Sequence, residues 1–305
     1  MAIKDMAASV LTRLKNQSKA EKIPFQLVLQ LFVQEEFLRK LSLSQYKDNL
    51  ILKGGMFIYT LTEFDSRPTR DIDFLIKNLH GSLENIEQIM RDICNINTGN
   101  DFIILEVLGS DNISVDKKYP GVKTSFIGRI GKVRIPFSID VGIDDVIVPN
   151  PIKRTIVTRL PDFVSPKVYT YSLESTIAEK FDAIFQRMAG TSRMKDFYDI
   201  YYLSGIFDFE GKILIEAIRS TLAHRNRYLT NDIFTEIEDF KNNDALNIQW
   251  KAFEPAKESG LLFDDVLDRM VVFLEPIYHN ILMNTEYDKR WSCEKKMWMK
   301  ESEEN

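Results

Sequence analysis

The residues best suited to chemistry lie in the stretch 53–74, KGGMFIYTLTEFDSRPTRDIDF. Gly54 and Gly55 stand between an apolar strand and an apolar helix, where bare backbone amides approach a phosphate closely and the helix N-terminus favours negative charge. Asp71 and Asp73 lie two residues apart on a predicted strand, so both carboxylates face the same side. Such a pair is typical of sites that bind Mg²⁺ together with phosphate oxygens of a substrate.

A third acidic residue, Asp140, lies in FSIDVGIDD between Ile139 and Val141. Its apolar neighbours predict a strand rather than a loop. Three carboxylates on adjacent strands can support a two-metal, in-line phosphoryl transfer. Each part also has an ordinary explanation: Asp-x-Asp as a solvated strand face, Gly-Gly as a turn, and Asp140 as the partner of a lysine or the cap of a turn. Their occurrence in this order favours the chemical interpretation.

The elements that position these residues follow from apolar periodicity. The first fifty residues are predicted to be helical, because Phe25, Val28, Leu29 and Phe32 recur at helical spacing. A strand, the Gly-Gly turn and a helix are predicted over 50–64. The further predicted elements are a strand over 71–76, a helix over 82–94, and strands over 102–108, 122–130 and 132–142. The alternation of the last strands indicates a mixed or antiparallel sheet.

The sequence changes character near residue 150. Four prolines between 149 and 166 predict a crossover between two lobes. Helices are then predicted over 173–189, 195–206, 210–225, 231–258 and 263–282, followed by a polar tail. We therefore expect an α/β (α+β) protein, with a lobe over 1–155 that combines a helical N-terminus with a mixed sheet, and a helical C-terminal lobe over 156–305.

Composition narrows the class of protein. The chain has 305 residues, 44% hydrophobic and 28% charged, as is ordinary for a soluble protein. A net charge of −5 does not indicate binding to duplex DNA through bulk electrostatics, although it leaves room for a local basic patch. Cys94 and Cys293 are too few for a disulfide framework or a zinc site. Without a run of eighteen apolar residues, no membrane span is expected, and a cytoplasmic location is the natural expectation.

The order GG…DxD…D resembles that of the DNA polymerase β-like nucleotidyltransferase superfamily. More closely, GGM…SRPTRDIDF, ESTIAEKFDAI and SRMKDFYDIYYL together resemble the AbiEii toxin family. These are the nucleotidyltransferase toxins of abortive-infection, or type IV toxin–antitoxin, systems, and they include the MenT-type toxins. The resemblance covers about residues 50–205. It implies a polymerase β-like N-terminal lobe with a mixed sheet and an all-helical C-terminal lobe.

The resemblance also implies roles for the strand acids and the loop before them. Asp71 and Asp73 match the family's metal-binding pair, and Asp140 matches its third strand acid. All three are therefore expected to bind metal and to be catalytic. Thr69 and Arg70, directly before this pair, are expected to lie with the nucleotide-binding residues.

In the helical lobe, Lys180 matches a family lysine expected to touch nucleotide phosphates. Asp196 matches a late acidic position, for which Asp199 is the alternative. Lys180 and Asp196 are thus expected to be catalytic, although pairing of Lys180 with a nearby carboxylate is the ordinary alternative. The complete set expected to contact nucleotide is Gly54, Gly55, Thr69, Arg70, Lys180 and Arg187.

The activity that the resemblance implies is transfer of a nucleoside monophosphate from an NTP to RNA, with Mg²⁺ or Mn²⁺ as cofactor. The expected acceptor is the 3′ end of tRNA, and its modification would block translation and growth. The implied partners are NTP, tRNA and a cognate antitoxin that need not bind the toxin directly. Two alternatives stay open: nucleotidyl transfer to a small molecule or protein, and a non-catalytic nucleotide-binding or partner-binding module. Loss of a carboxylate would favour the latter, and all three are present.

Overall fold

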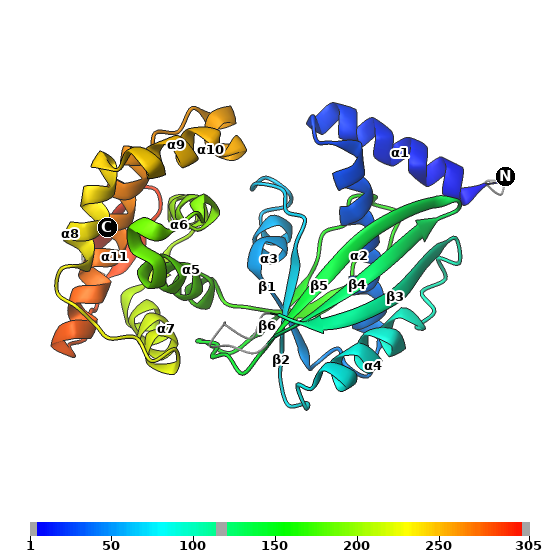
Figure 1. The fold of residues 1–305 in the computed structure, drawn as a ribbon, viewed down its shortest axis with the longest axis horizontal. Coiled ribbons are helices and arrows are strands. Elements are labelled where there is room, and N and C mark those ends of the chain that lie inside the picture. The colour runs from blue at the N-terminus through cyan, green and yellow to red at the C-terminus, as the bar shows by residue number, and fades with distance from the viewer. Residues whose placement is uncertain (1–4, 114–120, 301–305) are drawn as a thin grey trace. The chain divides into compact units, whose positions relative to one another are not determined.

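The computed structural model describes residues 5–113 and 121–300 (Figure 1). The chain forms two compact units. Unit 1 comprises Met1–Asp145 and Pro151–Tyr171, and unit 2 comprises Val146–Asn150 and Ser172–Asn305. Unit 1 carries a mixed sheet and unit 2 is mainly helical, so the predicted α/β class and the helical character of the C-terminal region are confirmed.

Within the described ranges, the sheet of unit 1 has seven strands in the order β3-β4-β5-β2-β1-β7-β6. Neighbouring strands are antiparallel, except that β2 runs parallel to β5 and β1 parallel to β7. The strands are β1 (Leu50–Lys53), β2 (Ile72–Ile76), β3 (Ile103–Asn112), β4 (Gly121–Ile130), β5 (Val133–Ile143), β6 (Ile152–Thr155) and β7 (Lys167–Thr170).

The helices of unit 1 are α1 (Met6–Glu21), α2 (Phe25–Leu43), α3 (Gly54–Leu61) and α4 (Leu83–Cys94). Helix α4 is amphipathic and packs on β3, and it begins where the Ser82 hydroxyl accepts a hydrogen bond from the N–H of Asn85. Helix α2 is buried on almost every side between Val28 and Leu41, because it packs against β5, β7 and α4. A helix enclosed in this way needs no polar face.

Charged residues of α2 form a buried ion network. The Arg39 guanidinium donates to the carboxylates of Glu36 at 2.7 Å and Glu35 at 3.2 Å, and the backbone N–H of Arg159 donates to Glu35 at 3.2 Å. Each of these residues is at most 4% exposed. Because a buried charge is costly without its partner, the network fastens α2 to the segment that precedes β7.

The segment 150–165, predicted as a crossover between lobes, instead contributes to the edge of the sheet. Strand β6 pairs with β7, and β7 pairs with β1, so residues 156–171 belong to unit 1 rather than to the lobe that the sequence analysis began at residue 156. Pro151 and Pro166 stand immediately before β6 and β7. Proline is tolerated at such positions because it has no N–H to give to the ladder.

In unit 2, the helix predicted over 231–258 is divided. The Asn243 side chain accepts from the N–H of Leu246 and starts a new helix, and Pro255 lies in the first turn of another. None of the helices in the described ranges is long and apolar enough to cross a membrane. The helices are α5 (Leu173–Arg187), α6 (Met194–Ile206), α7 (Gly211–His224), α8 (Ile233–Asp239), α9 (Asp244–Ala252), α10 (Glu254–Ser259) and α11 (Phe263–Met283).

The polar tail expected after α11 contains strands. In a small sheet, β9 (Arg290–Ser292) lies between β8 (Phe209–Glu210) and β10 (Met297–Met299). The indole of Trp291 donates to the Ser204 carbonyl at 2.7 Å, and that of Trp298 donates to the Phe273 carbonyl at 3.0 Å. These bonds attach the segment to α6 and α11. Strands of two or three residues are too short to leave an alternating pattern in the sequence.

Glu35 is expected to make stability depend on pH. Burial raises the pKa of Glu35 from 4.5 to about 7, against the opposing effects of Arg39 and Arg159. The folded chain then holds this proton more tightly than the unfolded chain, so the contribution of Glu35 to the free energy of unfolding is complete below pH 4.5 and is lost as the pH rises through about 7. Glu35→Gln should flatten this part of the profile, as measured by urea unfolding across the same interval.

Glu106→Gln is the matched control, because the Glu106 side chain on β3 is 53% exposed. It should keep the wild-type slope. The same slope in Glu35→Gln as in the wild type would contradict the assignment to Glu35.

Candidate active site

The strand acids come together through sheet register. Asp73 on β2 lies directly beside Asp140 on β5 in the parallel ladder. Asp71 immediately precedes β2 and has the same parity as Asp73. Ile72 and Phe74 point to the opposite face and are buried, whereas Asp73 and Asp140 are partly exposed. The expected placement of Asp73 and Asp140 on neighbouring strands is therefore confirmed; their catalytic and metal-binding roles stay predictions.

Two lysines extend this pair into a row of charges across four neighbouring strands. Lys123 on β4 lies opposite Asp140, and Lys53 at the end of β1 lies opposite Asp73. The charge row is thus Lys123, Asp140, Asp73 and Lys53. Lys53 Nζ also lies 3.6 Å from a carboxylate oxygen of Asp145. A lysine at each end offsets part of the repulsion between the adjacent carboxylates.

Lys123 is a residue of this site that the sequence analysis missed. Its Nζ lies 2.8 Å from Asp140 Oδ1. Partial burial lowers the pKa of Lys123, but the hydrogen bond to Asp140 and the charges of Asp140, Asp71 and Asp73 outweigh it, so the pKa is raised. Lys123 therefore interacts electrostatically with Asp71, Asp73 and Asp140. Asp140 is therefore both the partner of a lysine, as its ordinary explanation predicts, and a neighbour of Asp73.

The glycine turn is built against the acid pair. Gly54 begins α3 with φ +69°, a left-handed backbone that glycine adopts without strain. A Cβ at Gly54 would overlap the Asp73 carboxylate. A Cβ at Gly55 would lie 2.9 Å from Thr69 Oγ1. The two glycines thus let the start of α3 approach both Asp73 and the loop before Asp71.

The loop before β2 is held by α2. The side-chain amides of Gln30 and Gln34 donate to the Arg70 carbonyl at 2.7 and 2.8 Å. The Thr69 hydroxyl accepts from the N–H of Asp71 at 3.3 Å, and Thr69 is 7% exposed. These contacts make Thr69 a residue that shapes the loop, while the Arg70 side chain is exposed.

The chemistry of the acids fits a divalent cation shared with a phosphate. Mg²⁺ is commonly held by one or two carboxylates, and substrate oxygens and water complete its octahedron. Asp73 and Asp140, adjacent and partly exposed, offer such a pair. Over residues 5–113 and 121–300, no group of three or more His, Cys, Asp or Glu side chains is placed to hold a metal ion by itself. A metal held by Asp73 and Asp140 would therefore need further ligands, such as water or substrate oxygens.

The helical-lobe candidates form a separate buried cluster in unit 2. Lys180 Nζ on α5 lies 3.3 Å from Asp196 Oδ1 and 2.5 Å from Asp199 Oδ2 on α6. Arg193 Nε lies 2.5 Å from the other Asp196 oxygen. Lys180 is 8% exposed, and each acid is at most 2% exposed. Lys180 therefore forms ion pairs with Asp196 and with Asp199, the alternative to it. Arg187, the last residue of α5, is exposed.

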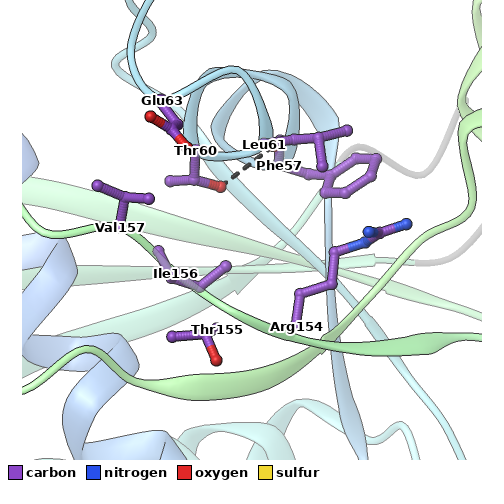
Figure 2. A pocket seen from close by; sticks show the side chains of 8 residues that line it. All are labelled: Phe57, Thr60, Leu61, Glu63, Arg154, Thr155, Ile156 and Val157. Atoms are coloured by element: carbon purple, nitrogen blue, oxygen red, sulfur yellow. Dashed lines mark hydrogen bonds between the residues drawn. The ribbon is translucent and has the colours of Figure 1, made fainter. Parts of the chain in front are cut away.

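A cavity of about 280 Å³ also lies in unit 1, between α3 and the residues around the end of β6 (Figure 2). Figure 2 shows the Arg154 side chain extending toward Phe57 and Leu61. Arg154 Nε is buried with no hydrogen-bond partner among the residues that the structure describes. None of the strand acids lines this cavity, so it is distinct from the charge row. Its lining residues are Phe57, Thr60, Leu61, Glu63, Arg154, Thr155, Ile156 and Val157.

The contact between Gly54 and Asp73 can be isolated by mutation. Gly54→Ala is expected to destabilise the chain by more than Gly99→Ala, as measured by urea unfolding. Both glycines have a left-handed backbone, which costs an alanine about 1–2 kcal/mol, but a Cβ at Gly99 would meet nothing within 4 Å. Equal losses for the two variants would mean that the Asp73 carboxylate moves aside freely.

The Lys180 cluster should contribute strongly to the stability of unit 2. Lys180→Met is expected to cost about 3–5 kcal/mol, because it leaves Asp196 and Asp199 buried without their ammonium partner. The matched control is Lys212→Met on α7, whose side chain is 54% exposed and whose loss should change little. Thermal unfolding compares the two. A Lys180→Met variant as stable as the control would rule out this structural role.

The chain is similar to a family of known proteins and to two solved structures. The profile described as nucleotidyl transferase AbiEii toxin, type IV TA system, matches residues 36–269. No curated protein sequence matches the chain. The crystal structure of JHP933 from Helicobacter pylori is similar with a TM-score of 0.48 and 15% identity, covering 85% of this chain and 94% of that one. A candidate nucleotidyltransferase of H. pylori is similar with a TM-score of 0.49 and 14% identity, covering 87% and 100%. With more than half of its length matched by the profile, the chain belongs to the AbiEii family of nucleotidyltransferase toxins of type IV toxin–antitoxin systems.

Proposed function

We propose that this nucleotidyltransferase toxin transfers a nucleoside monophosphate from an NTP to the 3′ hydroxyl of tRNA, with a divalent metal, and so blocks translation. The observation that carries the proposal is the register of Asp73 beside Asp140, with Gly54 packed against the Asp73 carboxylate. The carboxylates of Asp73 and Asp140 and the N-terminus of α3 therefore lie next to one another. Carboxylates for a metal and backbone amides for phosphates are two of the groups that enzymes use in phosphoryl transfer.

In this proposal Asp71, Asp73 and Asp140 would become ligands of Mg²⁺ together with phosphate oxygens once the nucleotide binds. When bound, the metal would neutralise charge that develops on the triphosphate. Asp140 orients the acceptor hydroxyl and takes its proton as the new oxygen–phosphorus bond forms at the α-phosphate. The bond between the α-phosphate and the bridging oxygen breaks, and pyrophosphate leaves. The amides at Gly54 and Gly55 hold phosphate oxygens at the N-terminus of α3.

Lys180 and Asp196 keep the catalytic assignment that the family resemblance gives them, with Asp199 as the alternative acid. Their mutual ion pair supports a common role, since the ammonium is oriented by both carboxylates. Thr69, Arg70 and Arg187 are proposed to lie near the nucleotide. The type IV family also implies a cognate antitoxin as partner, which in our proposal need not bind the toxin.

Asp73→Asn is expected to abolish nucleotide transfer and growth inhibition without unfolding the protein. The amide keeps the shape of the carboxylate beside Gly54 but removes the charge needed by the metal and the triphosphate. Expression in cells, transfer assays and thermal unfolding measure the three effects. The control is Asp101→Asn, at an exposed acid before β3. A normally folded Asp73→Asn variant that still arrests growth would mean that toxicity does not come from nucleotide transfer.

The acceptor is tested with radiolabelled NTPs and total tRNA. Label is expected at the 3′ end of tRNA, and periodate oxidation of the terminal ribose should prevent its incorporation because the accepting hydroxyl is destroyed. Label on the protein itself or on a small molecule, with none on tRNA, would support the alternative acceptors. Equal labelling of intact and oxidised tRNA would exclude the 3′ hydroxyl.

A further inference from the structure

We propose that Lys123 is a positioning residue that acts as the internal counter-ion of the carboxylate site: it holds Asp140 in the free enzyme and gives it up when nucleotide and metal bind together. The proposal rests on the proposed function, because it assumes that these carboxylates receive a metal. It concerns a residue outside the sequence motifs, on a strand that carries none of the predicted site residues.

Sheet geometry brings Lys123 and Asp140 together. Lys123 and Asp140 face each other in the antiparallel β4–β5 ladder, and their charged atoms lie 2.8 Å apart. Sheet pairing fixes both backbones, so the ammonium is delivered to this carboxylate by the fold rather than by a flexible loop. On the other side of the row, Lys53 contacts Asp145 and the Tyr171 hydroxyl, at 3.6 and 3.5 Å.

The charge of Lys123 also affects how strongly the carboxylates attract a cation. Neighbouring carboxylates attract a divalent cation, and each ammonium of the charge row weakens that attraction. Lys123 acts on Asp71 and Asp73 as well as on Asp140, so its charge weakens the attraction of the whole group for a cation. It also occupies one oxygen of Asp140 that a metal or an acceptor hydroxyl would use.

The ion pair between Lys123 and Asp140 is accessible to solvent. The Lys123 side chain is 47% exposed and that of Asp140 is 30% exposed, so the ion pair opens without unpacking the core. A triphosphate offers the ammonium new oxygen partners, and the transfer of Lys123 to phosphate releases Asp140. Metal and nucleotide then strengthen each other's binding, because each is favoured by the state that the other stabilises.

The experiment is a titration of the full-length protein with Mn²⁺ alone, followed by calorimetry, in the wild type, Lys123→Met and Lys132→Met. Lys132 lies in the turn of the same β4–β5 hairpin, and Lys132→Met makes the same change in net charge about 23 Å further along the strand. Lys123→Met is expected to bind Mn²⁺ about 3- to 10-fold more tightly than the wild type, as loss of a partly screened charge within a few ångströms implies. Lys132→Met should match the wild type.

Repeating the titration with a non-hydrolysable NTP analogue tests the coupling. The analogue should strengthen Mn²⁺ binding by a larger factor in the wild type than in Lys123→Met, and Lys123→Arg should retain the larger factor. In an Asp140→Asn background, Lys123→Met should change this factor by less, since the hydrogen-bonded partner of the ammonium is then neutral and only Asp71 and Asp73 still act on it.

The outcomes separate this proposal from the proposed function. Equal Mn²⁺ affinities in the wild type and Lys123→Met, with tRNA labelling intact, would overturn the counter-ion role and leave the enzyme activity standing. A gain in affinity in both lysine variants would also overturn it, because the effect would then follow net charge and not position. Failure of every variant to bind Mn²⁺, with or without the analogue, would contradict the metal site and the counter-ion role together.

Discussion

The parallel pairing of β2 with β5 is the constraint on which the rest of the site depends. It places Asp73 beside Asp140, although the helix α4 and the strands β3 and β4 intervene in the sequence. The antiparallel partners on either side, β1 and β4, then deliver Lys53 and Lys123 to the same row. A shift of one residue in the β2–β5 register would send one carboxylate to the buried face of the sheet, where an unpaired charge is costly.

Helix α2 supports this arrangement from within unit 1. Its glutamine side chains hold the backbone at Arg70, directly before the acid pair, while its buried ions hold the segment that leads to β7. The parallel strand β7 in turn borders β1, which ends at the glycine turn. Helix α2 therefore holds both the loop that precedes Asp71 and the segment that leads to β7. Its polar residues serve fixed hydrogen-bond partners, which explains why they interrupt an otherwise apolar helix.

Much of unit 1 could be predicted because its signals are local. The glycines at 54 and 55 and the alternation around Asp71 and Asp73 depend only on neighbouring residues. Lys123 could not be singled out, since its importance comes from the β4–β5 register and not from its own surroundings in the sequence. Similarly, Arg225 and Arg227 both bind the buried carboxylate of Asp182, which lies more than forty residues earlier in the sequence.

The small sheet of unit 2 has a consequence for the order of biosynthesis. Trp291 is fully buried against α6 and α11, so unit 2 lacks part of its core until the residues of β9 and β10 have left the ribosome. Unit 1, by contrast, is complete once Tyr171 has emerged. Because domains generally fold in the order of their synthesis, the strand carboxylates can be assembled while the buried Lys180 cluster is still unformed. A nascent chain would therefore hold three of the five side chains that we propose to be catalytic, Asp71, Asp73 and Asp140, before the other two are in place.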